Sequence, residues 1–413
     1  MENLKLALER RLSGDVLAII QRVATLASDK DICLYLVGGA VRDVLLDREV
    51  FDIDLVAEGD APLLARELAH AVRGSIKVHD RFGTVTYSTD GISIDLVTAR
   101  SETYPEPGAL PIVRPGSIAD DLYRRDFTIN ALAVHLSPPH YGELIDPYHG
   151  QEDMQQHLIR IIHPRSFIDD ATRILRALRY AQRLGFQLEQ ETAVLLQRDR
   201  SFLGTISGDR IRGELELIMQ EKMPEKVLQR AANLGILTCI HSSLPWNDSM
   251  PARFSHARIY PGVQAGAALY FALLAYDMSE KNCEEIISFL KLPHAVARVM
   301  RDTIMLKSHL SPLEENHLSR SKIYNLLYSY APEAVVALDI ATDIPVVHQY
   351  VNLFLTELRY ITSAINGKDL ARLGIKPGPR MGGILRIVKE ARLDGKVSTK
   401  EEEIELVKRL LKI

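Results

Sequence analysis

Strand-like patterns are confined to the first part of this chain, and that confinement limits its fold more than any other sequence feature. Short apolar runs at 33–37, 51–56, 84–88 and 92–97 are interrupted by helical periodicity at 41–46 and about 62–72. The Asp90-Gly91 pair between the last two runs predicts a hairpin. Residues 1–30 have the pattern of an amphipathic helix, and from about residue 169 onward helices are expected one after another with short breaks, as at 170–184, 191–197 and 208–220. The sequence therefore predicts an α+β protein, with a mixed sheet and helices first and an all-helical remainder after a boundary near 140–170.

The size and composition of the chain narrow its class. Its 413 residues are more than a domain with a single hydrophobic core usually contains, so several domains are expected. A net charge of -4 weighs slightly against a surface coated with nucleic acid, and the three cysteines have no metal-binding spacing. With no signal-peptide core and no apolar run of about 20 residues, we expect a cytoplasmic protein without a membrane segment.

Two acids stand at alternate positions of the second predicted strand. Asp52 and Asp54 would point to one face of a strand, with Ile53 and Leu55 turned toward a core. Adjacent carboxylates repel each other, and a Mg²⁺ ion that also holds substrate phosphates would remove that cost. Asp95, between apolar neighbours on a later strand, could complete such a site. The alternative is a set of surface acids on solvated strands.

A glycine pair lies just upstream of these acids. Gly38 and Gly39 separate a strand from a helix, where bare backbone N–H groups can approach a phosphate. Arg42, one turn into that helix, could add a bidentate phosphate contact. A glycine pair alone is more often only a tight turn, but the nearby acids favour a site for nucleotidyl transfer.

Four segments, taken in order, resemble a known family. They are GGAVRD at 38–43, DID at 52–54, RRDFTINA at 124–131 and DDATRILRALRY at 169–180. This order is similar to that of the polymerase-beta-like nucleotidyltransferase superfamily, and within it to class II CCA-adding enzymes (tRNA nucleotidyltransferases) and bacterial poly(A) polymerases. The resemblance is strong over about residues 30–215, and GKDL at 367–370 with KPGP at 376–379 looks like the family's C-terminal end.

The resemblance implies a layout and a set of site residues. The layout is a catalytic head at 1–145, a base-reading neck at 146–220, a helical body at 221–365 and a tRNA-binding tail at 366–413. Asp52 and Asp54 would bind the metal, Mg²⁺, and Asp95 would be the third catalytic carboxylate. The implied nucleotide-binding residues are Gly38, Gly39, Arg42, Arg124, Arg125, Asp126, Asn130, Asp170, Arg173, Arg176 and Arg179.

The base-reading assignment also has a physical reason. Asp170, Arg173, Arg176 and Arg179 recur every third residue and would form one stripe of a helix, with Ile174, Leu175, Leu178 and Ala181 on its other faces. Cytosine and adenine both present an amino donor beside a ring-nitrogen acceptor. A carboxylate and a guanidinium match that pattern and mismatch guanine and uracil. The alternative is the solvated basic face of an amphipathic helix.

The segment 101–120 is rich in Pro and Gly and is expected to be a long loop. In the resembling family, a mobile segment at this place helps the switch from C to A addition, and CC-only enzymes typically lack it. Its presence here disfavours CC-only activity, although a simple connector remains the alternative. Arg210 and Glu214, at i and i+4, are expected to form a helix-stabilising ion pair.

These features predict an enzyme that adds C, C and A to tRNA 3′ ends from CTP and ATP, without a template, by metal-assisted transfer. The alternatives are an A-adding or CC-adding partial enzyme, a poly(A) polymerase, which a long basic extension would favour, and an inactive RNA-binding homologue. A metal-dependent phosphohydrolase at the His79-Asp80 pair is a further, weaker alternative. The oligomeric state and the tRNA contacts of 240–360 do not follow from the sequence.

Overall fold

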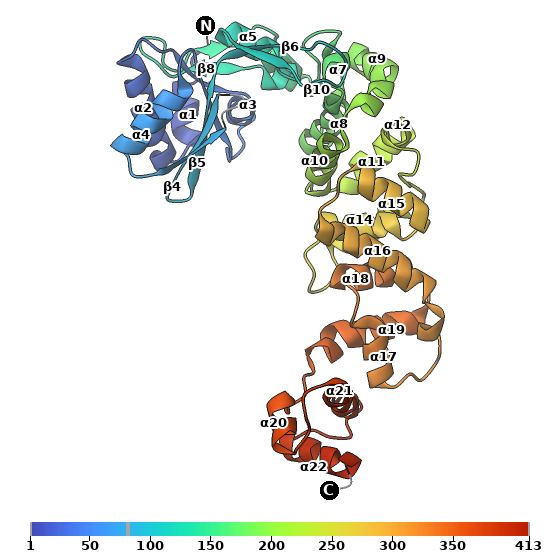
Figure 1. Ribbon diagram of the computed structural model, residues 1–413. Helices are drawn as coiled ribbons and strands as arrows, with labels where there is room; N and C mark the ends of the chain where they lie inside the picture. Colours follow the sequence, from blue (N-terminus) through green and yellow to red (C-terminus); the bar gives the residue numbers. More distant parts are fainter. Residues whose placement is uncertain (1, 80–82, 412–413) are drawn as a thin grey trace. The chain divides into compact units, whose positions relative to one another are not determined.

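The computed structural model describes residues 2–79 and 83–411 and divides into two compact units. The first unit comprises Met1–Glu214 and Asn233–Ile240, and the second comprises Leu215–Ala232 and His241–Ile413. Strands occur in the first unit and helices make up most of the second (Figure 1). The α+β class expected from the sequence is confirmed.

Two helices, rather than the single one expected over 1–30, begin the first unit. They are α1 (Lys5–Arg11) and α2 (Gly14–Ser28). Ser13 causes the break, because its backbone is extended and its hydroxyl accepts a hydrogen bond from the Val16 N–H at 3.3 Å. A serine in this position caps the new helix and satisfies one of its unpaired N–H groups.

A seven-stranded mixed sheet forms the centre of the first unit. Its strands lie in the order β3-β4-β5-β2-β1-β8-β9, and only β2 and β5 run parallel. Asp90 and Gly91, with φ of 42° and 82°, make the tight turn of the expected β4–β5 hairpin. The strands are β1 (Leu34–Val37), β2 (Ile53–Ala57), β3 (Ser75–His79), β4 (Thr84–Thr89), β5 (Ile92–Thr98), β8 (Ala133–His135) and β9 (Leu144–Ile145).

The two faces of this sheet have different roles. Ile53 and Leu55 are buried, as expected, on the face against which α4 (Ala61–Ala71) packs beside β3, β4 and β5. Asp54 and Val56 alternate to the opposite face. The β2–β5 register places Asp95 directly beside Asp54 on that second face. The acids therefore lie on the face that α4 leaves uncovered.

The segment expected to be a long loop is instead a β-hairpin followed by a helix. Strands β6 (Arg100–Thr103) and β7 (Ile112–Pro115) pair antiparallel, and α5 (Ile118–Tyr123) follows with a Ser117–Asp120 capping box. Gly108, with φ of 81°, lies at the tip of the hairpin, where an added Cβ would come within 2.5 Å of the Thr205 carbonyl oxygen. Glycine at this position thus permits close contact between the hairpin and the helical part of the unit.

Helices with short connections complete the first unit. The expected helices at 170–184, 191–197 and 208–220 are confirmed with small changes of boundary. A two-residue parallel pair joins the segments before and after α8, β10 (Leu158–Ile159) with β11 (Gln187–Leu188). The elements are α3 (Gly39–Leu45), η2 (Thr128–Asn130), α6 (Gly150–Gln155), α7 (Ser166–Asp169), α8 (Thr172–Leu184), α9 (Gln190–Asp199), η3 (Arg200–Thr205), α12 (Ile236–Ile240) and the first part of α10 (Gly208–Met219), within which the unit boundary falls.

The second unit is helical. Its α14 (Ala267–Ala275) is apolar on every side and is buried against α13, α16 and α18, which makes it a core helix. The other helices are α11 (Pro224–Asn233), α13 (Met250–Arg258), α15 (Glu280–Phe289), α16 (His294–Ser308), η4 (Ser311–Leu313), α17 (Arg320–Leu327), α18 (Pro332–Ala341), α19 (Pro345–Thr356) and η5 (Leu358–Tyr360).

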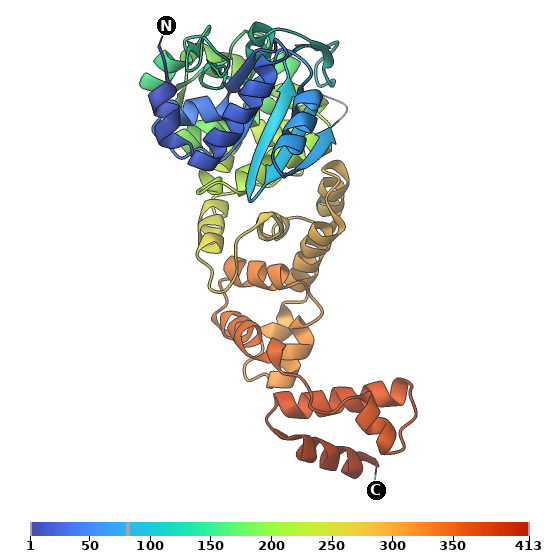
Figure 2. The ribbon, with the colours of Figure 1, turned by 90° about the vertical axis from the view of Figure 1, so that its left-hand side faces the viewer.

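Three further helices of this unit lie together at the C-terminal end of the chain (Figure 2), and they share a small apolar core of their own. They are α20 (Gly367–Arg372), α21 (Pro379–Leu393) and α22 (Lys400–Leu411). The Glu403 side chain is fully buried there and accepts hydrogen bonds from the Ile365 N–H at 2.9 Å and Arg392 Nη1 at 2.6 Å. Within residues 2–79 and 83–411, no helix has the length and apolar character needed to cross a bilayer.

Candidate active site

A pocket of about 500 Å³ in the first unit brings together most of the residues singled out from the sequence. The second face of the sheet and one side of α8, from Arg173 to Arg183, both contribute to its wall. The expected residues that line it are Gly39, Arg42, Asp52, Asp54, Arg124, Arg125, Asp126, Asn130, Asp170, Arg173 and Arg176. Gly38, Asp95 and Arg179 lie next to these residues in the chain or the sheet and do not belong to that lining.

The carboxylates lie at one side of the pocket. Asp54 is on β2, whereas Asp52 precedes the strand and is exposed. Burial raises the pKa of Asp54, the neighbouring carboxylates of Asp95 and Asp52 raise it further, and Arg125 opposes them. Asp95 Oδ1 accepts a hydrogen bond from Thr86 Oγ1 at 2.6 Å. The site thus concentrates negative charge where a cation would be stabilised.

No cluster of three or more His, Cys, Asp or Glu side chains with metal-site geometry occurs among the described residues. A pair of carboxylates is still the donor set with which proteins hold Mg²⁺ when substrate phosphates supply the other ligands. The acids present therefore fit that ion better than a metal caged by protein alone. For the phosphohydrolase alternative, Asp80 of the His79-Asp80 pair lies outside the described residues.

The glycine pair makes a sharp turn between β1 and α3. Gly38 has a φ of 69°, and a Cβ there would lie 2.5 Å from Arg125 Nη1. Only glycine satisfies both the left-handed backbone and this close approach. Arg42, in the first turns of α3, forms a two-nitrogen contact with Asp43 at 2.9 and 3.0 Å and donates from Nη1 to Asn130 Oδ1 at 2.6 Å. These contacts fix its guanidinium at the pocket wall.

A buried acid that the sequence analysis missed holds the two arginines of the RRD segment. Asp121 on α5 accepts from Arg124 Nη2 at 2.6 Å and from Arg125 Nη2 at 2.9 Å. Burial alone would raise the pKa of Asp121, but the two guanidinium groups lower it below its ordinary value. The i, i+3 and i, i+4 spacing from Asp121 to these arginines was the available signal.

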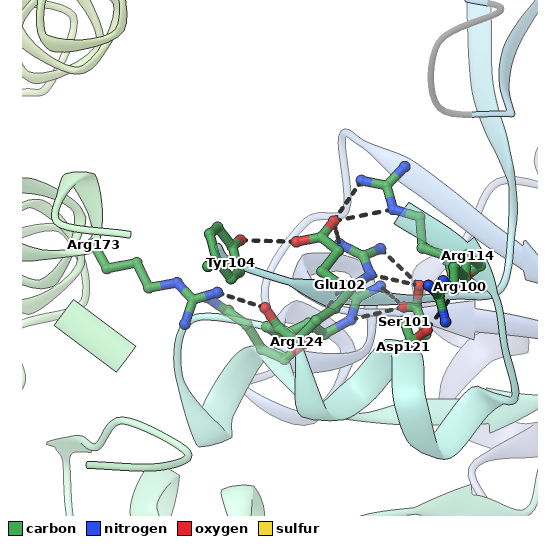
Figure 3. A network of polar contacts seen from close by, with 10 residues as sticks. Arg100, Ser101, Glu102, Tyr104, Arg114, Asp121, Arg124 and Arg173 are labelled. Carbon is green, nitrogen blue, oxygen red and sulfur yellow. Dashed lines mark hydrogen bonds and ion pairs between the residues drawn. The ribbon is translucent and has the colours of Figure 1, made fainter. Parts of the chain in front are cut away.

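The β6–β7 hairpin joins the same network (Figure 3). Glu102 Oε1 accepts from Arg100 Nε at 3.1 Å and from Arg124 Nη1 at 3.3 Å, and the Tyr104 hydroxyl donates to Glu102 Oε2 at 2.9 Å. Burial, with Glu102 beside it, raises the pKa of the Tyr104 hydroxyl above its ordinary value. Glu102 and Tyr104 both line the pocket, so the hairpin is part of the site.

Asp170 is held in an orientation that the helical stripe did not predict. Helix α8 begins at Thr172, and Asp170 precedes it with an extended backbone. Its Oδ1 accepts from the Thr172 N–H at 3.0 Å, from Thr172 Oγ1 at 2.7 Å and from Arg210 Nη2 at 2.8 Å. Arg210 thus binds Asp170, and the expected Arg210–Glu214 ion pair is wrong.

The arginines of α8 are not a solvated basic face. The exposed fractions of Arg173 and Arg179 are 5% and 3%. Arg173 donates to Ser166 Oγ at 2.7 Å and to the Arg124 carbonyl oxygen at 2.6 Å. Arg176 contacts Asp126 Oδ2 through Nη2 at 2.7 Å, and Glu214 accepts from Arg176 at 3.5 Å and Arg179 at 3.4 Å.

The apolar positions between these arginines behave as expected. Ile174, Leu175 and Leu178 are fully buried and Ala181 is 2% exposed. The arginine stripe therefore lies inside the first unit, between the apolar packing of α8 and the pocket. Buried guanidinium groups require partners. Acids supply them for Arg176 and Arg179, whereas Arg173 has a hydroxyl and a backbone carbonyl.

Family models match three parts of the chain. A poly A polymerase head domain matches residues 34–160, a probable RNA and SrmB-binding site of polymerase A matches 185–245, and a putative tRNA nucleotidyltransferase domain 2 matches 266–407. The first match contains the glycine turn, the acids and the RRD segment, and the last two fall in the helical part.

Curated relatives cover nearly the whole chain. An A-adding tRNA nucleotidyltransferase of Geobacter sulfurreducens is 34% identical over 98% of this chain, which spans 48% of that protein. Another, from Halalkalibacterium halodurans, is 30% identical over 98% of this chain and 95% of its own length. A CCA-adding enzyme of Lactobacillus johnsonii is 30% identical over 90% of this chain and 91% of its own length.

Solved structures agree with this relationship. An apo CCA-adding enzyme superposes with a TM-score of 0.81 and 28% identity over 100% of this chain and 99% of that one. A Thermotoga maritima CCA-adding enzyme complexed with tRNA superposes with a TM-score of 0.77 and 28% identity, covering 99% of both chains. On the sequence motifs, the pocket and these similarities, the chain belongs to the tRNA nucleotidyltransferase family.

Proposed function

We propose that this protein adds nucleotides to the 3′ end of tRNA without a template, and that it incorporates the terminal adenosine. The observation that carries the proposal is a single pocket lined by the acids Asp52 and Asp54, by Gly39 of the tight turn and by the Asp170 and Arg173 side chains. Such a pocket could hold a triphosphate near a metal and read a base with side chains alone.

The number of nucleotides added is the finer part of the proposal. Three relatives named A-adding are 30–34% identical to this chain, and relatives named CCA-adding are 27–30% identical. Terminal A addition is common to both activities, and the complete hairpin at 100–115 is consistent with it. The full addition of C, C and A, expected from the sequence, is retained as a second candidate.

Mg²⁺ is the metal that we propose for Asp52 and Asp54. When bound, it would stabilise negative charge on the transferred phosphate and lower the pKa of the attacking hydroxyl. Asp95 is proposed as the third carboxylate, acting from its position beside Asp54. Its contact with Thr86 would keep that carboxylate oriented.

The chain's own residues would orient the reaction. The O3′ atom of the tRNA forms a bond to the α-phosphorus while the bond to the β-phosphate oxygen breaks, the hydroxyl proton leaves and pyrophosphate departs. The N–H groups after Gly38, together with Arg42 and Arg125, would bind the triphosphate. Asp126 and Asn130 would fix the ribose and these arginines, since Asn130 donates to Asp126 and accepts from Arg42.

Base choice is proposed to depend on Asp170 and Arg173. Three donors converge on Asp170 Oδ1, and no donor among the described residues reaches Oδ2. That second oxygen could accept the amino group of adenine or cytosine, while Arg173 donates to the ring nitrogen. Guanine and uracil would present a carbonyl and an N–H to these groups and leave them unpaired, which is a strong basis for rejection.

The remaining assignments concern the partners and the parts of the chain. We propose tRNA, ATP and CTP as partners and the cytoplasm as location. The head at 1–145 would carry catalysis and the neck at 146–220 base reading, while the body at 221–365 and the tail at 366–413 would bind tRNA. The boundary between the compact units at Glu214 lies near the proposed end of the neck and supports the border between neck and body alone.

The test is a product-length assay on one tRNA prepared with three ends: the discriminator base, C, and CC. Each is incubated with ATP, with CTP and with both. The proposal predicts that the CC end gains one A; full CCA activity would bring all three ends to the same length when both nucleotides are present. A long ladder with ATP would indicate a poly(A) polymerase, and no extension of the CC end would refute the proposal.

A further inference from the structure

One tyrosine of α8 lies against four arginines. The guanidinium carbons of Arg42, Arg176, Arg179 and Arg183 are 5.3, 5.5, 5.1 and 5.8 Å from the centroid of the Tyr180 ring. Energetically significant cation–π pairs occur about once per 70–80 residues, so four on one ring is an unusual concentration.

The Tyr180 ring reduces the repulsion between these arginines. Guanidinium groups gathered around one point repel each other, and the negative face of an aromatic ring attracts each of them. Carboxylates offset part of the charge: Asp43 faces Arg42, and Glu214 contacts Arg176 and Arg179. The edge of Phe127, with centroids 5.9 Å apart, holds the ring in place.

The cluster also links two parts of the pocket. Arg42 comes from α3, directly after the glycine turn, whereas Arg176 and Arg183 lie about two turns apart on α8. These three arginines and Tyr180 itself line the pocket. A ring that contacts arginines from both elements fixes the spacing between them, and that spacing decides whether they can bind one polyanion together.

We propose that Tyr180 is a positioning residue for a set of phosphate-binding arginines, and that Arg183 is a member of this set. The ligand is the polyphosphate part of a nucleoside triphosphate, or the pyrophosphate that leaves. The proposal rests on the proposed function, because it assigns these residues to the same pocket. The aromatic face carries the effect, since the hydroxyl contributes only a 3.5 Å contact with Arg176.

The test measures pyrophosphate and ATP binding by calorimetry in the presence of Mg²⁺, on the full chain without tRNA. Tyr180→Phe keeps the ring and should stay within about threefold of the native affinity. Tyr180→Leu should bind pyrophosphate at least about tenfold more weakly, with its preference for ATP over GTP unchanged. Tyr276→Leu is the matched control, because that ring faces Arg253 and Lys307 in the second unit.

Arg183→Met supplies an independent variant that leaves the ring intact. It should weaken pyrophosphate binding while the thermal unfolding midpoint stays at the native value. Native pyrophosphate affinity in Tyr180→Leu, or equal losses in Tyr180→Phe and Tyr180→Leu, would overturn the assignment. Arg183→Met with native affinity would remove Arg183 from the set.

Two further outcomes distinguish a role in pyrophosphate binding from a role in tRNA binding and from the proposed function. Filter binding of tRNA should be unchanged in Tyr180→Leu, and a loss of tRNA binding with native pyrophosphate affinity would assign the arginines to RNA phosphates and overturn the proposal. If the native protein binds pyrophosphate but extends no tRNA, the proposed function fails while the role of Tyr180 can still be measured.

Discussion

Arg176 binds Asp126 through two nitrogens, with Nε at 2.8 Å and Nη2 at 2.7 Å from Asp126 Oδ2. Asp126 is buried, and burial alone would raise its pKa, but Arg176 and Asn130 lower it below the ordinary value. The contact joins the RRD segment to α8. It therefore fixes the residues expected to bind the triphosphate relative to the helix expected to read the base.

Asp126→Ala should destabilise the first unit by about 1–3 kcal/mol, because the partly buried Arg176 guanidinium loses its closest acceptor and keeps only Glu214 as an acid partner. Equilibrium urea unfolding followed by circular dichroism measures the change. Arg165→Ala is the control: its pair with Asp169 is exposed, with 67% of the Arg165 side chain accessible, and should matter by less than about 1 kcal/mol. Equal losses in the two variants would contradict this ranking.

Replacement of Asp170 should alter base choice more than triphosphate binding. Asp170→Ala removes a charged acceptor worth roughly 1.5–3 kcal/mol, so incorporation of ATP should fall by about 10–100-fold relative to GTP. Single-nucleotide incorporation on tRNA ending in CC measures the ratio, and pyrophosphate binding should be nearly native. Asp169→Ala, one position earlier, should leave the ratio alone. An unchanged ratio in Asp170→Ala would refute the base-reading role.

The hairpin should affect catalysis through Glu102. Glu102→Gln keeps the shape of the side chain and removes the charge that faces Arg100 and Arg124. We expect kcat for A addition to fall by about tenfold or more, with a smaller change in KM for ATP, since Arg124 would lose one of its two acids. Glu106→Gln at the exposed tip is the control, and identical kinetics in both variants would exclude a role for this network.

Part of the stability that the second unit loses at acid pH should come from the Asp394 carboxylate. Its carboxylate accepts from the Ser321 N–H at 2.8 Å and Ser321 Oγ at 3.0 Å. Burial raises the pKa of Asp394, but the Ser321 and Lys396 contacts outweigh it and lower the pKa overall. A carboxylate whose pKa is lowered by folding stabilises the folded state at pH values above its ordinary pKa, near 4. That contribution is lost as the pH falls below this value.

Asp394→Asn should therefore show a weaker loss of unfolding free energy between about pH 4 and pH 2 than the native chain. Urea unfolding at a series of pH values measures the two slopes. The amide can still accept from the Ser321 N–H, so the variant should fold. Parallel slopes in the two proteins would show that this carboxylate does not contribute to the acid transition.

Much of the fold could be predicted from local patterns. The Thr89-Asp90-Gly91 turn, the glycine pair before α3 and the apolar period of α8 are each determined by neighbouring residues, and the structure agrees with them. The β6–β7 hairpin could not be found in this way. Its strand residues are mostly half-buried or exposed and its connection is rich in proline, so the sequence lacks the apolar alternation of a core strand.

The site shows the same limit. The identity of its acids and arginines followed from the motifs, but their pairing depends on segments distant in sequence. Asp170 meets Arg210 across 40 residues and Arg176 meets Asp126 across 50. Periodicity could place Asp170 on a helical stripe, yet the hydrogen bonds from Thr172 hold it before the helix in an extended conformation. Such pairings are set by tertiary packing.

The most direct test of the account is the sequence of the tRNA 3′ end after reaction with all four nucleoside triphosphates together. The substrate is tRNA ending in CC, and mass spectrometry of the terminal fragment identifies what was added. We expect one added A with the native protein and no addition with Asp52→Asn. Addition of G or U, a run of several A residues, or full activity in Asp52→Asn would contradict it.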